Sequence, residues 1–173
     1  MWAAQQQSWF EQERREKAEE TLQTITGGDS FAYFSTTGLS PGATSGLLVL
    51  VHQGEYPLYD LTARWVDLRK FDKIKGNITI QNFTSADTNM TIGSLTPGFS
   101  RLSGPLDLGS SNERGFNIFF TARNGGFTQE LRFRRVDNQW LSATRVTRHR
   151  TEAPLYERID DEYPRNDENE IEW

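Results

Sequence analysis

Three arginines are the side chains of this sequence that best fit a binding chemistry. In the segment ELRFRRV, Arg132 and Arg134 are two residues apart and therefore share one face of an extended strand. Arg145 joins that face if it lies opposite Glu130 across the following turn. Guanidinium groups bind carboxylates and phosphates, so this predicted interaction face suits an acidic partner segment, an anionic surface or the chain's own acidic end. The competing interpretation is an ordinary solvated sheet face whose charges discourage edge pairing.

Aromatic side chains offer a second binding chemistry. Tyr56, Tyr59 and Trp65 are close in the sequence, and exposed aromatic rings can stack on sugars. In an alternating strand, however, Tyr59 and Trp65 share the side of Leu61, which favours the core as their location. A small-ligand or carbohydrate-binding platform built from Tyr56, Tyr59 and Trp65 is therefore the alternative to the arginine face.

Catalytic arrangements have weaker support. The chain has no cysteine, only two histidines (His52 and His149) and no G-x-S-x-G pattern. A hydrolytic carboxylate pair would have to come from Glu55, Asp60 and Asp67. Because Asp60 and Asp67 point to opposite faces of a regular strand, a hydrolase is the least favoured alternative. We predict a non-enzymatic protein.

Metal and cofactor sites are not predicted. Acidic residues form runs at 160–162 and 167–170, and hard cations bind clustered carboxylates. These runs lack the central glycine of a calcium-binding loop, and the chain has neither zinc-type ligand spacing nor a phosphate-binding glycine loop. We therefore expect a solvated acidic segment and no cofactor.

A meander of three strands over residues 115–150 must position the arginines. Asn124-Gly125 suits a two-residue turn at positive φ, which would place Ala122 opposite Phe127. That register also pairs Phe120 with Gln129, Ile118 with Leu131 and Phe116 with Phe133. One face of the hairpin is then almost entirely apolar. A second two-residue turn at Asp137-Asn138 would bring Arg145 opposite Glu130 and onto the arginine face.

Short segments of strand character, separated by turn signals, fill the chain before this meander. The expected strands are 30–36, 45–53, 58–68, 77–84, 88–95 and 106–108, with loops over most of 99–114. No helical period separates them, which argues against a parallel α/β sheet. We predict a mainly β, antiparallel immunoglobulin-like β-sandwich over residues 27–151, a pattern that a small barrel would share.

Residues 1–26 are expected to form an N-terminal α-helix that ends at Gly27-Gly28. Its apolar face is thin, so an isolated helix would be marginal and needs a partner. That partner would be the body, a second copy in a coiled coil, or a preceding membrane segment for which the helix is a stalk. No stretch of this chain is long and apolar enough to span a membrane, and the compartment stays open.

Residues 152–173 form an acidic C-terminal tail that carries nine acidic and two basic side chains in a chain of net charge −5. The rest of the chain therefore carries a net charge of +2, and a tail–body contact is electrostatically allowed. Such a tail would compete with phosphate, so nucleic-acid binding is not expected. Residues 164–172 are predicted to be disordered, and Trp173 is either a docking anchor or incidental.

Three segments carry a resemblance: GGDSFAY at 27–33, VHQGEYPLYDLTARWVDL at 51–68 and ARNGGFTQELRFRRVDNQWLSATRV at 122–146. Together they resemble a group of uncharacterised bacterial proteins in which a membrane segment and a charged helix precede a β domain. The resemblance implies a membrane-proximal β-sandwich and carries no catalytic residue. With the residues themselves, it leads us to expect an interaction or sensory module, which binds a protein partner or self-associates through the helix.

Overall fold

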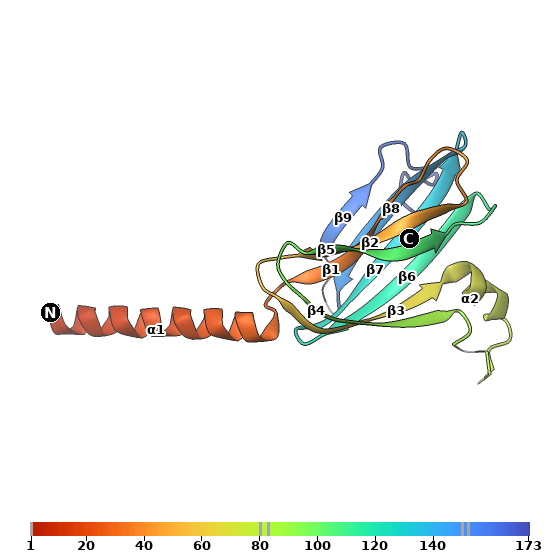
Figure 1. The fold of residues 1–173 in the computed structure, drawn as a ribbon. Helices are drawn as coiled ribbons and strands as arrows, with labels where there is room; N and C mark the ends of the chain where they lie inside the picture. Colours follow the sequence, from red (N-terminus) through yellow and green to blue (C-terminus); the bar gives the residue numbers. More distant parts are fainter. Residues whose placement is uncertain (1, 80, 83, 150, 152) are drawn as a thin grey trace.

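Two antiparallel β-sheets lie face to face and form the body of the protein (Figure 1). The computed structural model describes residues 2–79, 81–82, 84–149, 151 and 153–173. The smaller sheet has the order β1-β2-β5, and the larger sheet has the order β4-β3-β6-β7-β8-β9. The strands are β1 (Phe31–Thr37), β2 (Ser45–Gln53), β3 (Leu58–Asp67), β4 (Asp87–Leu95), β5 (Ser100–Asp107), β6 (Glu113–Ala122), β7 (Gly125–Val136), β8 (Gln139–Arg148) and β9 (Pro154–Ile159). The predicted mainly β, antiparallel architecture is confirmed.

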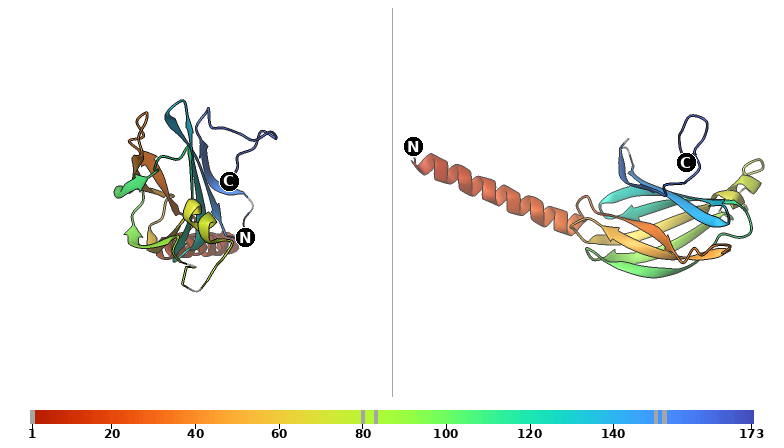
Figure 2. Two further views of the ribbon diagram at one scale, coloured as in Figure 1. Left: turned by 90° about the vertical axis from the view of Figure 1, so that its right-hand side faces the viewer. Right: turned by 90° about the horizontal axis from the view of Figure 1, so that it is seen from above.

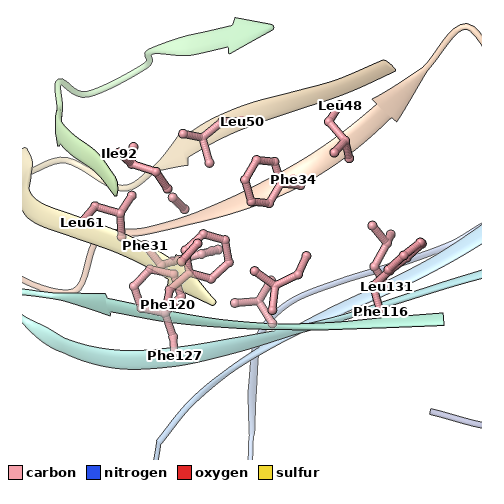
Figure 3. Close-up of a cluster of buried hydrophobic side chains, with 14 of the residues drawn as sticks. Phe31, Phe34, Leu48, Leu50, Leu61, Ile92, Phe116, Phe120, Phe127 and Leu131 are labelled. Atoms are coloured by element: carbon pink, nitrogen blue, oxygen red, sulfur yellow. The ribbon is translucent and has the colours of Figure 1, made fainter. Parts of the chain in front are cut away.

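Aromatic and aliphatic side chains of both sheets meet in the core between them (Figure 3). Phe34 of the smaller sheet stacks on Phe120 with ring centroids 5.7 Å apart, and Phe120 stacks on Phe127 at 4.9 Å. All three rings are fully buried. Burial of one such ring stabilises the fold by about 1.5–3 kcal/mol, so this stack is a major part of what holds the two sheets together.

The β6–β7 hairpin turns one residue earlier than the sequence predicts. Ala122 pairs with Gly125 and not with Phe127, because Arg123 and Asn124 are the turn residues. Neither turn residue has positive φ, and the left-handed position falls on Gly125, at φ 114°. The predicted register is therefore wrong by two residues. A shift of two leaves every side chain on its face, so the apolar face is confirmed by the burial of Phe116, Ile118, Leu131 and Phe133.

A short helix, α2 (Leu68–Ile74), follows β3, begins at the last residue of the predicted strand 58–68 and was not predicted. Asp67 caps it, because its side-chain carboxylate accepts from the backbone N–H groups of Arg69 and Lys70 at 3.1 and 3.3 Å. The described residues of the predicted strand 77–84 form bends and turns, while residues 80 and 83 of that strand lie outside the described residues. β5 runs through the segment predicted as loops and pairs with β2.

Strand β9 extends the larger sheet beyond the predicted domain boundary at residue 151. It pairs antiparallel with β8, with Arg145 opposite Glu157 and Val146 opposite Tyr156. The boundary was placed at residue 151 because the composition becomes acidic there, although Leu155, Tyr156 and Ile159 are apolar positions that can pack on the body. The sheet therefore continues to Ile159, and only the residues after it form a separate C-terminal segment.

Helix α1 (Trp2–Thr26) confirms the predicted N-terminal helix and projects away from the sheets (Figures 1 and 2). Its 25 residues correspond to a length of about 37 Å. Trp9 and Phe10 are 61% and 56% exposed, so α1 does not bury these side chains against the body. Neither helix among the described residues has the length and apolar character needed to cross a membrane.

Candidate functional site

Pairing between β7 and β8 places the predicted arginines on the outer face of the larger sheet. Asp137 and Asn138 form the predicted two-residue turn with φ of 47° and 66°. Glu130 consequently lies opposite Arg145, as expected from the sequence. Arg132 and Arg134 alternate with core residues of β7, so they face away from the apolar interior.

Arg132 is buried, and the expectation that it faces solvent is wrong. Its Nη1 donates to the carbonyl oxygen of Phe116 at 2.8 Å, and its Nη2 donates to Oδ1 of Asn117 at 2.9 Å. Burial lowers the pKa of Arg132, and Glu130, 3.6 Å away, acts in the opposite direction. Arg132 therefore links β7 to β6 through these hydrogen bonds, and its role on the outer face is structural.

Arg134 and Arg145 are the two predicted arginines that remain accessible, with side chains 33% and 29% exposed. Arg134 donates from Nη1 to the carboxylate of Glu113 on the paired strand. Arg145 donates from Nε and Nη2 to Oε2 of Glu130 at 2.8 and 2.6 Å. Each guanidinium is thus fixed on one side by a sheet carboxylate, while its other side is available to a second partner. We refer to Arg134 and Arg145 as the arginine pair.

The last residues of the chain lie on the arginine pair. Nη2 of Arg134 donates to Oε2 of Glu172 at 3.1 Å. The ring of Trp173 lies with its centroid 4.3 Å from Cζ of Arg145, within cation–π distance. Tyr163 is buried below this contact, and burial raises the pKa of its phenol against the opposing effect of Arg134. We refer to residues 160–173 as the C-terminal arm.

A tight turn returns the C-terminal arm to the sheet, although residues 164–172 were predicted to be disordered. The side-chain Oδ1 of Asn166 accepts from the backbone N–H groups of Glu168 and Glu170 at 3.1 and 2.8 Å. Asn169 has φ 63°, a left-handed conformation that asparagine tolerates better than most residues. The turn therefore directs residues 171–173 back over β7 and β8. The sequence signal for this turn is the pair of asparagines, Asn166 and Asn169, that flank Asp167 and Glu168.

Open space remains on both sides of the Arg134–Glu172 contact. One cavity of about 210 Å³ lies between α2, β6, β7 and the C-terminal arm. A second cavity of about 320 Å³ is lined by Arg134, Arg135, Tyr163 and the turn of the arm. The C-terminal arm therefore covers the arginine pair without filling the surface around it.

A buried ion pair supports the first cavity. Nη1 and Nη2 of Arg114 donate to the two carboxylate oxygens of Asp67 at 3.1 and 3.0 Å, and the side chains are only 4% and 7% exposed. Asp67 also caps α2, so this pair joins the helix to β6. No local pattern in the sequence indicates this ion pair, because Arg114 and Asp67 are 47 residues apart.

The aromatic platform predicted from Tyr56, Tyr59 and Trp65 is not assembled. Trp65 packs in the core, 5.3 Å from the ring of Phe34, whereas the ring of Tyr59 is covered by the guanidinium of Arg123 at 4.7 Å. A β-bulge at Tyr59 interrupts the expected alternation of side chains between the two faces of β3. Tyr56 lies in the β2–β3 loop, where its backbone N–H donates to Oγ of Ser30.

The candidate hydrolytic carboxylates are also separate. Asp60 pairs with Arg123 at 2.9 Å, Asp67 pairs with Arg114, and Glu55 is exposed in a loop. His52 is buried and its Nε2 contacts the carbonyl oxygen of Tyr56 at 2.8 Å. Within the described ranges, no three His, Cys, Asp or Glu side chains are grouped closely enough to hold a metal ion.

The β6–β7 turn forms a second structural centre, where α1 meets the body. Nδ2 of Asn124 lies 3.3, 3.1 and 2.7 Å from the carbonyl oxygens of Gly27, Gly28 and Ser30. Nη1 of Arg123 donates to the carbonyl oxygen of Ile25 at 3.2 Å. These donors satisfy carbonyls at and beyond the end of α1 that lack helical partners. The sequence predicted Asn124 as a turn residue and missed this capping role.

Comparison with known proteins gives no relative for this chain: no family model, no curated protein and no solved structure matches it. The site must therefore be interpreted from its own geometry.

Proposed function

We propose that this protein is a non-enzymatic interaction module that binds an acidic segment of a partner protein on the arginine pair. The observation that carries the proposal is the placement of Arg134 and Arg145 on one outer face, each fixed on one side by a sheet carboxylate and contacted on the other by one of the last two residues of the chain. A guanidinium held in this way has lost part of its conformational entropy before a partner arrives. Two such groups form a specific recognition surface for carboxylates.

The strand order supports an immunoglobulin-like body for this module. If β1, β2 and β5 correspond to strands A, B and E, then β3, β6 and β7 correspond to C, F and G, and β4 lies beside C. Strands β8 and β9 then extend the second sheet beyond G. In this assignment the arginine pair lies on strand G and on the added strand β8, outside the core of the sandwich.

The projecting helix supports a stalk role within the same proposal. Charged side chains surround α1 between residues 11 and 20, with Lys17 and Glu13 paired at 2.8 Å, and Trp9, Phe10, Leu22 and Ile25 remain exposed. A helix that is polar on all sides is typical of a solvated spacer between two bodies. We propose that α1 holds the module away from a membrane or from a second domain, or pairs with α1 of another copy.

Binding of a fluorescein-labelled hexaglutamate peptide tests the function. We expect millimolar or tighter binding at low salt that weakens as salt is added, and weakens about tenfold in Arg134→Ala/Arg145→Ala. Arg14→Ala/Arg15→Ala removes the same charge from exposed positions of α1 and is the matched control. The assay is run in the wild type and in Glu172→Ala. An equal loss of peptide affinity in Arg134→Ala/Arg145→Ala and in Arg14→Ala/Arg15→Ala would reject the proposal. Failure of the peptide to bind both the wild type and Glu172→Ala would also reject it.

A groove favours small-ligand binding as a second candidate function. It has a volume of about 220 Å³ and lies between β1 and the inner face of β8 and β9. The rings of Tyr33 and Tyr156 are stacked there at 4.5 Å, and hydroxyl side chains and the charges of Arg158 and Asp160 complete the lining. Aromatic rings with neutral overall charge and many hydroxyl groups suit a neutral polyol. Chemical-shift changes at Tyr33 on addition of monosaccharides would support this function, and their absence from a panel of hexoses and pentoses would reject it.

A further inference from the structure

The contacts of the C-terminal arm resemble those of a ligand more than those of a structural element. Glu172 supplies a carboxylate to one arginine and Trp173 supplies an aromatic face to the other. These two adjacent residues contact the sides of Arg134 and Arg145 that the sheet carboxylates leave free. From this geometry we infer that the arm is a tethered ligand, and that the face recognises a partner segment with an acidic residue followed directly by an aromatic one. This inference rests on the proposed function.

Exposure separates the arm into an anchored part and a displaceable part. Tyr163 is buried against the sheet, and Asp160 is held by the backbone N–H and the hydroxyl of Ser142 at 2.7 and 3.0 Å. Glu172, by contrast, is 68% exposed in its contact with Arg134. Exposed ion pairs are weak, and the cation–π contact of the half-buried Trp173 ring adds only about 0.5–2 kcal/mol. The last two residues can therefore leave the sheet while residues 160–163 stay in place.

The surroundings of the contact leave room for a better ligand than the arm itself. Cavities of about 210 and 320 Å³ flank Glu172 and are lined by further guanidinium groups, including those of Arg69 and Arg135. A partner segment with side chains that fill this space would bury more surface than the arm does. The arm then acts as an intramolecular competitor, which lowers the apparent affinity for partners without abolishing binding.

Tethering strengthens a weak competitor. The turn at residues 166–170 returns the arm to the face, so the Glu172-Trp173 pair is present at a high effective concentration. With one exposed ion pair and one cation–π contact, we expect the docked arm to weaken binding of a competing segment by about tenfold.

The test uses the chain's own sequence as the ligand. The probe is a fluorescein-labelled peptide of residues 166–173, NDENEIEW, and binding is followed by fluorescence anisotropy. The proteins are the full-length wild type, Glu172→Ala/Trp173→Ala, and Glu168→Ala as a control that removes one exposed arm charge outside the contact. A peptide in which the final Glu-Trp is replaced by Ala-Ala controls for non-specific charge.

We expect Glu172→Ala/Trp173→Ala to bind the probe about tenfold more tightly than the wild type and the Glu168→Ala control. Adding Arg134→Ala/Arg145→Ala to the Glu172→Ala/Trp173→Ala protein should remove binding of the probe. The Ala-Ala peptide should bind weakly to every protein. Equal affinities of the wild type and Glu172→Ala/Trp173→Ala would overturn the tethered ligand and leave the arginine pair as a binding face. Binding that survives the loss of both arginines, or that no variant shows, would overturn the proposed function as well.

Discussion

Replacing Asn124 with alanine should loosen the attachment of α1 to the body. The side-chain amide of Asn124 lies within hydrogen-bond distance of three carbonyl oxygens of residues 27, 28 and 30, at 2.7 to 3.3 Å. It has two N–H hydrogens, so the contacts amount to about two full bonds. At about 0.5–1.5 kcal/mol each, we expect Asn124→Ala to lower the free energy of unfolding by about 1–3 kcal/mol.

Substitution with aspartate distinguishes hydrogen bonding from simple packing. Asn124→Asp keeps the size of the side chain but presents only acceptors to three carbonyl oxygens near the negative end of the α1 dipole. We therefore expect Asn124→Asp to be more destabilising than Asn124→Ala at neutral pH. If packing alone mattered, the isosteric aspartate would be the milder change.

The assay combines urea unfolding with a distance measurement. The chain has no native cysteine, so spin labels can be attached at Glu19→Cys on α1 and Ser110→Cys on the body, both exposed positions. We expect the distance distribution from double electron–electron resonance to broaden in Asn124→Ala. An unchanged distribution together with a change in unfolding free energy below about 0.5 kcal/mol, the range of ordinary surface substitutions, would refute the capping argument.

Three further substitutions test the support around the site. Arg114→Met should cost about 3–5 kcal/mol in urea unfolding, because it leaves the buried carboxylate of Asp67 without its partner, and adding Asp67→Asn should restore part of the loss. Burial lowers the pKa of His52 below the ordinary 6.5, so its contribution to stability is complete above pH 6.5 and is lost as pH falls. Unfolding free energies at pH 8 and pH 5 should therefore differ more in the wild type than in His52→Gln. Gly28 has φ 52° and a Cβ there would overlap the ring of Tyr56, so Gly28→Ala should lower the free energy of unfolding in urea by at least the strain of about 1–2 kcal/mol.

The faces of the central hairpin could be predicted from sequence even though its register could not. Alternation fixes which side of the sheet a residue occupies, and a shift of two residues does not alter that side. The predicted turn had positive φ at both Asn124 and Gly125, whereas only Gly125 adopts it and the turn residues are Arg123 and Asn124. Residues such as Phe116 and Leu131 were therefore placed correctly in the core, while the pairs that they form were not.

The candidate site was harder to predict because long-range contacts decide its exposure. Arg132 is on the predicted face, but carbonyl and amide oxygens of β6 bury its guanidinium, and no local pattern indicates this. In β3, the positive φ of Asp60, 56°, lies within the bulge that interrupts the alternation, and this alternation had predicted a core location for Tyr59 and Trp65. The cap of α2 did leave a readable signal, because an aspartate followed by Leu-Arg-Lys is typical of a helix start.

The β6–β7 hairpin connects the two centres, since its turn holds α1 and its other end carries Arg134 opposite Glu113. The ladder between them has no register shift and spans about 30 Å. Such a ribbon is stiff, and coupling over this distance requires an element with two discrete arrangements.

We therefore predict that Asn124→Ala leaves the affinity of the NDENEIEW probe unchanged within about twofold, because distant sites without shared partners are additive. Probe binding is measured in Glu172→Ala/Trp173→Ala with and without Asn124→Ala. An additive result favours an interaction module on a passive stalk. A change in affinity well beyond twofold would show that α1 and the arginine pair are coupled, which is the behaviour that distinguishes a sensor from a binding domain.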